Sequence, residues 1–179
     1  QLKKIQVIVD EVNALEKDIS NLSDEELRKK TDDFREIIGV DLDTCRRDFS
    51  KYNEVELENL LEEEKTKLIE ILPQAFAVIR EVSKRVANHR HFDVQVMAGY
   101  VLFDNKVAEL FTGEGKTLAA NLPLYLYGLT GRGAHLVTVN DYLAKRDAEW
   151  TGHILNSLGM TTAAINSGVQ YRYISDEEA

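Results

Sequence analysis

A glycine-rich turn followed by a lysine and a threonine most constrains the fold of this chain. The turn reads Thr112-Gly-Glu-Gly-Lys-Thr117, and it stands between a short apolar run at residues 107–110 and a helical stretch at residues 116–129. A strand, a glycine loop and a helix in this order form the context in which a loop can wrap phosphate groups. The sequence therefore predicts a phosphate-binding loop at the start of a helix.

Each residue type in this loop has a physical role. Gly113 and Gly115 can adopt backbone angles closed to other residues, so that successive N–H groups point inward at an anion. Lys116 would then reach the β- and γ-phosphates as a point charge, and the Thr117 hydroxyl would bind Mg²⁺. The general pattern has Gly six positions before the lysine, where this chain has Leu110. The alternative is a glycine-rich turn with an accidental Lys-Thr pair.

The residues after the loop alternate between strand and helix patterns. Residues 135–139 are rich in β-branched side chains and predict a strand, residues 141–158 a helix and residues 161–165 another short strand. Pro123 is expected to kink the 116–129 helix or end it early. Such alternation predicts a parallel sheet with helices on both faces.

The first part of the chain has helical periodicity instead. Apolar residues at steps of three and four (Ile5, Ile8, Val12 and Leu15) predict a first helix. Ser23 and Glu26 form a capping box that starts a second helix, which ends at Gly39.

An acidic region follows. Residues 40–53 are polar and irregular, residues 55–72 predict a very acidic helix, and Glu62-Glu-Glu64 is expected to be a solvated face. Pro73 suits the first turn of a separate helix at residues 75–87, with Phe76, Ile79, Val82 and Val86 inward. Arg80, Lys84 and Arg85 are then expected on its other faces.

The composition excludes some classes of function. The formal net charge is −9, and residues 1–70 hold 20 acidic but only 12 basic side chains, which disfavours a broadly basic nucleic-acid footprint. Cys45 is the single cysteine, which fits a reducing compartment. No window is apolar enough to span a membrane. The four histidines (His89, His91, His135 and His153) show no metal-ligand spacing. The first residue is Gln, and the chain is treated as a possible fragment.

Four segments stand together in the order and spacing of one family. They are Leu72-Pro-Gln-Ala-Phe-Ala-Val-Ile-Arg80, Arg90-His-Phe-Asp-Val-Gln95, the stretch 108–117 with the glycine loop, and the stretch 137–150 with Val137-Thr-Val-Asn-Asp141. Together they closely resemble the start of the first nucleotide-binding domain of SecA, the preprotein translocase ATPase. The resemblance runs from about Leu22 to the C-terminus and is weakest over residues 40–70.

The resemblance implies roles for individual residues. It makes Gln95 the contact to adenine, with Phe92 beside the base, although a plain helix-surface residue is the alternative reading of Gln95. The loop residues matched without change, which the resemblance makes nucleotide ligands, are Gly113, Glu114, Gly115, Lys116 and Thr117. Lys116 and Thr117 are the expected catalytic pair, and Thr117 the Mg²⁺ ligand. The pair Asn140-Asp141 matches a motif that links the site to neighbouring domains, or is simply a helix N-cap.

The resemblance also implies a fold and a function. The expected fold is α/β: a partial P-loop (RecA-like) motor domain with a parallel sheet over residues 73–179, incomplete, preceded by an N-terminal helical region over residues 1–72. The expected cofactors are ATP and Mg²⁺. The implied partners are preproteins, the Sec membrane channel and an anionic membrane surface, with no specific nucleic acid; a homodimer is left open. The expected location is the cytoplasm and the periphery of the bacterial inner membrane, or the plastid stroma.

Two other classes of protein remain as alternatives: a non-catalytic nucleotide-binding interaction module, and a helicase-type P-loop ATPase. No Asp-Glu-x-Asp segment occurs in the sequence. Since ATP hydrolysis in this class needs such an acid near Mg²⁺, the chain by itself is expected to bind nucleotide weakly and to hydrolyse it negligibly.

Overall fold

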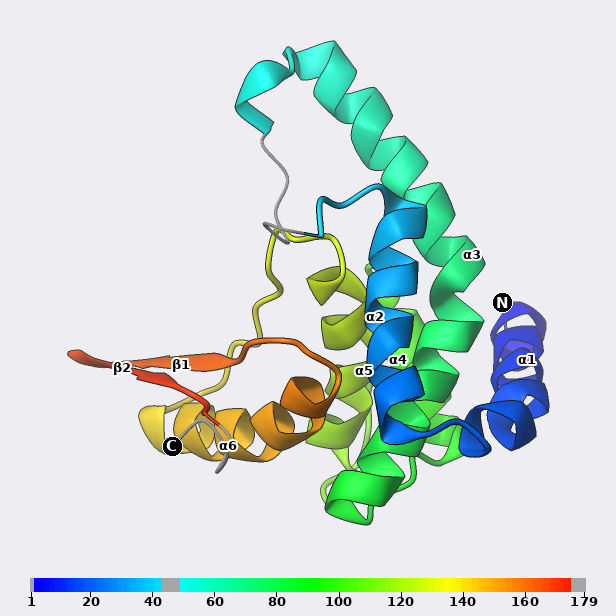
Figure 1. Ribbon diagram of the computed structural model, residues 1–179. Helices are drawn as coiled ribbons and strands as arrows, with labels where there is room; N and C mark the ends of the chain where they lie inside the picture. The colour runs from blue at the N-terminus through cyan, green and yellow to red at the C-terminus, as the bar shows by residue number, and fades with distance from the viewer. Residues whose placement is uncertain (1, 43–48, 175–179) are drawn as a thin grey trace.

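The computed structural model describes residues 2–42 and 49–174, and it is dominated by helices (Figure 1). In chain order the elements are α1 (Leu2–Ser20), α2 (Asp24–Ile38), the 3-10 turn η1 (Phe49–Lys51), α3 (Glu54–Ala87), α4 (Asp93–Phe103), α5 (Lys116–Gly128), α6 (Asp141–Ser157), β1 (Ala163–Asn166) and β2 (Val169–Arg172). The long helix α3 packs against α1, α2, α5 and α6, and α4 packs against α1 and α5. Cys45 lies outside the described residues.

The α3 helix is continuous, which corrects the prediction of two helices separated at Pro73. A proline inside a helix costs about 3 kcal/mol, because it removes one hydrogen bond and crowds the preceding turn. Around Pro73, however, Leu72, Ala75 and Phe76 are all buried. Burial of a large apolar side chain is worth about 1.5–3 kcal/mol, so packing on both sides of the proline outweighs the local cost. The N-terminal part of α3 projects beyond the other helices at the top of Figure 1.

The predictions for the first two helices are confirmed. In α1, Val12 is fully buried, and it faces α3 with Val9 and Ile19. At the start of α2, the Ser23 Oγ accepts from the Glu26 N–H and the Glu26 carboxylate accepts from the Ser23 N–H. Gly39 ends α2 with a φ of 85°, the left-handed angle for which glycine is suited.

One apolar core holds these helices together. Its largest members come from α2, α3 and α5, and include Phe34, Phe76, Tyr125 and Leu126. The α5 helix runs through Pro123 to Gly128, so the proline does not end it early. Since α5 is built into this core, the core also fixes the helix that follows the glycine loop.

The sheet differs from the expected one. Within the described part of the chain, β1 and β2 form an antiparallel hairpin, with Ala163 opposite Arg172. The expected strand at 161–165 is thus formed in part, but residues 107–110 and 135–139 have no regular secondary structure. A strand requires a neighbouring backbone for its hydrogen bonds, and within residues 2–42 and 49–174 the only strand pairing is that of β1 with β2. The parallel sheet is therefore not seen in this structure.

No helix in residues 2–42 and 49–174 combines the length and the apolar character that a membrane span requires.

Candidate nucleotide-binding site

The glycine loop leads directly into α5. Gly113 and Gly115 have φ angles of 90° and 77°, which are left-handed and therefore costly for residues with a side chain. The prediction that these two glycines adopt angles closed to other residues is confirmed. Gly115 is the last residue before the helix, and its carbonyl accepts the N–H of Ala119 as the first turn begins.

The N-terminus of α5 is open to an anion. No side chain caps it, so the N–H groups of its first turn have no capping side-chain partner within the described residues. Helix N-termini carry a partial positive charge and bind phosphate for this reason. Lys116 is exposed and donates from Nζ to the Phe111 carbonyl at 2.8 Å, across the mouth of the loop. Thr117, the next residue, is half-buried. These residues fit the phosphates of a nucleotide.

Gln95 joins the first turn of α4 to the glycine loop. Its Oε1 accepts from the Phe92 N–H at 2.9 Å, and its Nε2 donates to the Glu114 carbonyl at 3.0 Å. The side chain is 5% exposed, so Gln95 is not the plain helix-surface residue of the alternative reading. Phe92 is 67% exposed beside it. The structure therefore brings together Gln95 and the loop, which lie about one helix apart in the sequence.

The contact between Gln95 and the loop leaves no room for a side chain at Gly115. A Cβ built there would lie 2.3 Å from Nε2 of Gln95, whereas a Cβ at Gly113 would meet nothing within 4 Å. Gly115 is consequently required both by its backbone angle and by the close approach of Gln95.

His91 connects the segment before α4 to the first turns of α5. It is fully buried, and its Nε2–H donates to the Leu118 carbonyl in α5 at 2.9 Å. Burial, together with the nearby charges of Arg80 and Arg90, lowers the pKa of His91 to about 4, although the hydrogen bond to Leu118 acts in the opposite direction. The hydrogen bond to a carbonyl requires the Nε2–H tautomer, which leaves Nδ1 without a partner among the described residues. From the sequence the histidines are assessed only as metal ligands, so the structural role of His91 as a donor to the Leu118 carbonyl is not predicted.

Arg80 was also misplaced by the sequence reasoning. It was expected on an outer face of its helix, yet its side chain is 2% exposed and lies beneath the start of α4. Its position is four residues after Phe76 and three before the fully buried Ser83, which is the spacing of one helix face. That spacing was the available signal, and the charge of the side chain concealed it.

Two further expectations have clear outcomes. Glu64, expected in a solvated acidic face, is buried and forms an ion pair with Arg132, whose guanidinium stacks over the Phe49 ring. Asn140 caps α6 by accepting the Leu143 N–H at 2.9 Å, so the N-cap reading is confirmed. Asp141 accepts the Ser167 N–H in the turn of the hairpin at 3.1 Å.

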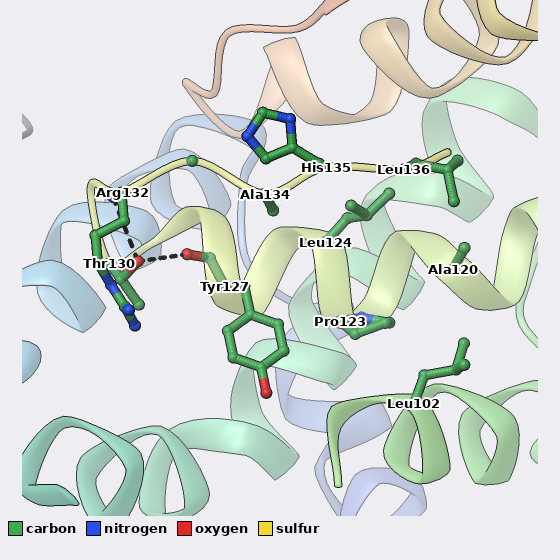
Figure 2. Close-up of a pocket in the computed structure, with 11 residues that line it drawn as sticks. Leu102, Ala120, Pro123, Leu124, Tyr127, Thr130, Arg132, Ala134, His135 and Leu136 are labelled. Carbon is green, nitrogen blue, oxygen red and sulfur yellow. Dashed lines mark hydrogen bonds between the residues drawn. The ribbon is translucent and has the colours of Figure 1, made fainter. Parts of the chain in front are cut away.

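A separate hollow of about 420 Å³ lies between α4, α5 and the segment after α5 (Figure 2). Its lining is Leu102, Ala120, Pro123, Leu124, Tyr127, Thr130, Arg132, Gly133, Ala134, His135 and Leu136. This lining is mainly apolar and includes no residue of the glycine loop. The hollow is therefore distinct from the glycine loop.

No group of three or more His, Cys, Asp or Glu side chains converges on a metal position in the part of the chain that the structure describes.

Comparison with known proteins agrees with this geometry. A family model described as "SecA DEAD-like domain" matches residues 1–176, so the match includes α1 and begins earlier than the Leu22 expected from the sequence. The chain is 54% identical over 169 residues to "Protein translocase subunit SecA" of Crocosphaera subtropica and 53% identical over 169 residues to that of Synechocystis sp.. The protein of the same name from Carboxydothermus hydrogenoformans is 48% identical over 173 residues.

These alignments cover 94%, 94% and 96% of this chain, but only 16%, 16% and 17% of the relatives. The chain thus spans about one sixth of the length of the curated proteins that it matches. Within that span the match is nearly complete, and the 179-residue chain belongs to the SecA DEAD-like domain family.

Proposed function

We propose that this chain is the ATP-binding portion of a SecA-type motor, which couples ATP hydrolysis to the transport of preproteins across a membrane. One observation carries the proposal: Gln95 is hydrogen-bonded to the glycine loop at Glu114, where an uncapped helix N-terminus begins. An adenine reader and a phosphate cradle side by side are what an adenine nucleotide requires. The family membership supports the same conclusion.

In this proposal the phosphates bind in the 113–117 loop. The N–H groups of Gly113 and Gly115 and of the first turn of α5 would surround them, and the Glu114 N–H would join them by giving up its bond to the Phe111 carbonyl at 3.2 Å. Lys116 would exchange its hydrogen bond with the Phe111 carbonyl for the β- and γ-phosphates, a displacement that its exposure allows. Thr117 would hold Mg²⁺ through its hydroxyl; the ion supplies charge neutralisation between the phosphates when it is bound. Lys116 and Thr117 are the proposed catalytic residues of this chain.

The adenine would be read by Gln95. A carboxamide offers two donors and an acceptor, which matches the N6 and N7 edge of adenine. Its Nε2 retains a second hydrogen after donating to the Glu114 carbonyl. Phe92, exposed beside it, offers a ring face for the base.

We further propose that residues 73–179 form part of a RecA-like domain whose parallel sheet is completed by segments outside this chain. The support is the exposure of apolar residues at the two expected strands: Val107 is 94% exposed and Val137 is 90% exposed. Apolar β-branched residues that face water in this number favour burial against further chain. The helical residues 1–72 would then be an arm packed on that domain.

The partners follow from the same proposal. They are preprotein substrates, the Sec channel and an anionic membrane surface, reached by the whole motor from the cytoplasm at the bacterial inner membrane or from a plastid stroma. A homodimer is compatible with it. Since the sequence has no Asp-Glu-x-Asp segment, we expect the 179-residue chain to bind nucleotide but to hydrolyse it negligibly. ATP turnover by the purified chain that disappears in Lys116→Ala would contradict this last point.

Calorimetric titration of the chain with Mg·ATP and Mg·ADP tests the proposal. Saturable binding is expected, with weaker binding in Lys116→Ala because a charge on the phosphates is lost, and in Gln95→Ala because the adenine contact is lost. Lys29→Ala, an exposed lysine of α2, is the matched control and is expected to bind as the unchanged chain does. A folded chain that binds neither nucleotide would overturn the proposal.

A further inference from the structure

The buried guanidinium of Arg80 lies between α1 and the start of α4. It donates from Nε to the His91 carbonyl at 2.9 Å, from Nη1 to Asn13 Oδ1 at 2.6 Å, and from Nη2 to Asp93 Oδ1 at 2.9 Å. Asn13 itself donates from Nδ2 to the other carboxylate oxygen of Asp93 at 3.3 Å. A guanidinium holds its donors in one plane, so three partners at once fix their relative positions. An α1 side chain is thereby tied to the first residue of α4.

A second set of contacts joins Glu16 of α1 to Arg90, the residue before His91. Both carboxylate oxygens of Glu16 accept from Arg90, at 2.5 Å from Nε and 2.7 Å from Nη2. Arg90 also donates to the His91 carbonyl at 3.2 Å, so that this carbonyl accepts from two guanidinium groups. The hydrogen bond with Arg90 lowers the pKa of Glu16, which favours the charged pair. Bidentate pairs of this kind restrict orientation more than single contacts do.

The backbone of residues 90–93, which these contacts hold, leads directly to Gln95, the proposed adenine contact. Phe92 follows the His91 carbonyl, and its N–H donates to Oε1 of Gln95 at 2.9 Å. The other end of the Gln95 side chain donates to the Glu114 carbonyl in the glycine loop. A line of direct contacts therefore runs from α1 through the 90–93 segment to Gln95. No hydrogen bond or ion pair between α1 and the glycine loop is among those found in the described residues.

We propose that α1 positions the adenine-reading segment of this chain: through Asn13 and Glu16 it fixes the backbone that leads into Gln95. The inference rests on the proposed function, because it assigns adenine to Gln95. Asn13, Glu16, Arg80 and Arg90 are positioning residues, since none of them faces the glycine loop. Loss of these ties loosens the orientation of the Gln95 carboxamide directly, and it affects the phosphate cradle less, through the single hydrogen bond from Gln95 to the Glu114 carbonyl.

A purely structural role of α1 makes a different prediction. Val9, Val12 and Ile19 pack α1 into the core, and a general loss of packing would weaken every ligand alike. A positioning role instead lowers the affinity for an adenine nucleotide more than the affinity for a ligand that lacks the base. Inorganic pyrophosphate with Mg²⁺ is such a ligand, because it offers the loop phosphates alone.

The experiment titrates Mg·ADP and Mg·pyrophosphate into the chain and into the single variants Asn13→Ala and Glu16→Gln. Asn13→Ala removes the bonds to Arg80 and Asp93, and Glu16→Gln disrupts the bidentate pair with Arg90; each is expected to weaken ADP about 5-fold and pyrophosphate clearly less. Glu11→Gln is the matched control: it removes the same charge from an exposed position of the same helix and is expected to change neither affinity. Equal weakening of both ligands, or no change in ADP affinity, would overturn the inference.

Amide hydrogen exchange of the ligand-free chain separates this inference from the proposed function. Faster exchange at residues 92–96 in Asn13→Ala and Glu16→Gln, with unchanged exchange in α6, is the expected result. Unchanged exchange at residues 92–96 would overturn the positioning role by itself. If the unchanged chain bound neither ADP nor pyrophosphate, the proposed function would fail, and the exchange result would still decide whether α1 holds this segment.

Discussion

Nε2 of Gln95 donates to the Glu114 carbonyl at 3.0 Å, and it lies too close to the position that a Cβ on Gly115 would take. Gln95 and the glycine loop, the proposed contacts for adenine and for phosphate, thus touch each other directly. Because the contact uses only one hydrogen of the carboxamide and a backbone carbonyl, it can hold the loop without consuming the loop's N–H groups. This relationship makes the two glycines of the loop unequal.

Gly115→Ala is expected to be far more harmful than Gly113→Ala. Both substitutions put a side chain at a left-handed angle, which costs about 1–2 kcal/mol. At Gly115 the new Cβ must also displace Gln95, whereas the space at Gly113 is open. Urea denaturation and ADP titration of the two variants check this. Equal losses of stability and affinity would show that the Gln95 contact has no influence on the loop.

The buried His91 predicts a loss of stability in mild acid. Burial lowers its pKa from 6.5 to about 4, so between these pH values the unfolded chain binds more protons than the folded one. The free energy of unfolding is therefore expected to fall as the pH drops from 6.5 to 4, by up to about 3 kcal/mol from this residue. Above pH 6.5 the contribution of His91 is constant.

Denaturation at a series of pH values measures this slope. In His91→Gln, whose amide can still donate to the Leu118 carbonyl, the part of the slope due to His91 should disappear. His135→Gln changes an exposed histidine and serves as the control. An identical pH profile in His91→Gln and in the unchanged chain would contradict the prediction.

Thr31 and Tyr125 form a buried hydrogen bond between α2 and α5 at 2.9 Å. Tyr125→Phe would leave the Thr31 hydroxyl buried without this partner, and we expect it to cost about 1–3 kcal/mol of stability. Thr31→Val should cost a similar amount, and the double variant less than the sum, because neither group is then left alone. Tyr142→Phe, at a residue 72% exposed, is expected to be neutral. Strict additivity of the two changes would disprove the coupling.

Pro73 interrupts the hydrogen bonding of α3, so Pro73→Ala is expected to stabilise the chain. The new N–H can bond to the Ile69 carbonyl, and the gain should be about 1–3 kcal/mol, reduced by the greater freedom of the unfolded chain. Pro123→Ala in α5 should gain less, because Pro123 is buried and its ring packs in the helix layer. Thermal or urea denaturation tests both. A loss of stability in Pro73→Ala would mean that the ring itself is needed at that bend of the core.

The parts of the site that could be predicted from the sequence are those that depend on a few adjacent residues. The glycine angles at 113 and 115, the start of α5 at Lys116 and the N-cap at Asn140 follow from local backbone chemistry. Gln95 was identified only through the family resemblance, since a single amide on a helix has no local signal of a ligand. Its bond to Glu114 joins residues from two elements, so no local pattern could reveal it.

The predictions that charged side chains face water were wrong at two positions, because partners from distant parts of the chain compensate the cost of burying them. Glu64 lies in an acidic run and was expected in water, but Arg132, far along the chain, neutralises it. Arg80 was placed on an outer face, yet it is satisfied by groups from α1 and from the start of α4. A buried charge is tolerated only when such partners are present, and they are not visible in the sequence around it.

Features with local signals could be predicted from the residues alone: the capping box at Ser23, the left-handed stop at Gly39, the glycine loop and membership of the family. Features that need contacts with distant residues depend on the tertiary structure. Packing against the core keeps α3 continuous through Pro73. Residues 135–139 are irregular although their β-branched side chains favour a sheet, and no strand pairs with them in the part of the chain that the structure describes. The physical reason is the same in each case: caps and glycine angles are satisfied within a few residues, whereas burial, ion pairs and strands are satisfied only by groups that folding brings from elsewhere.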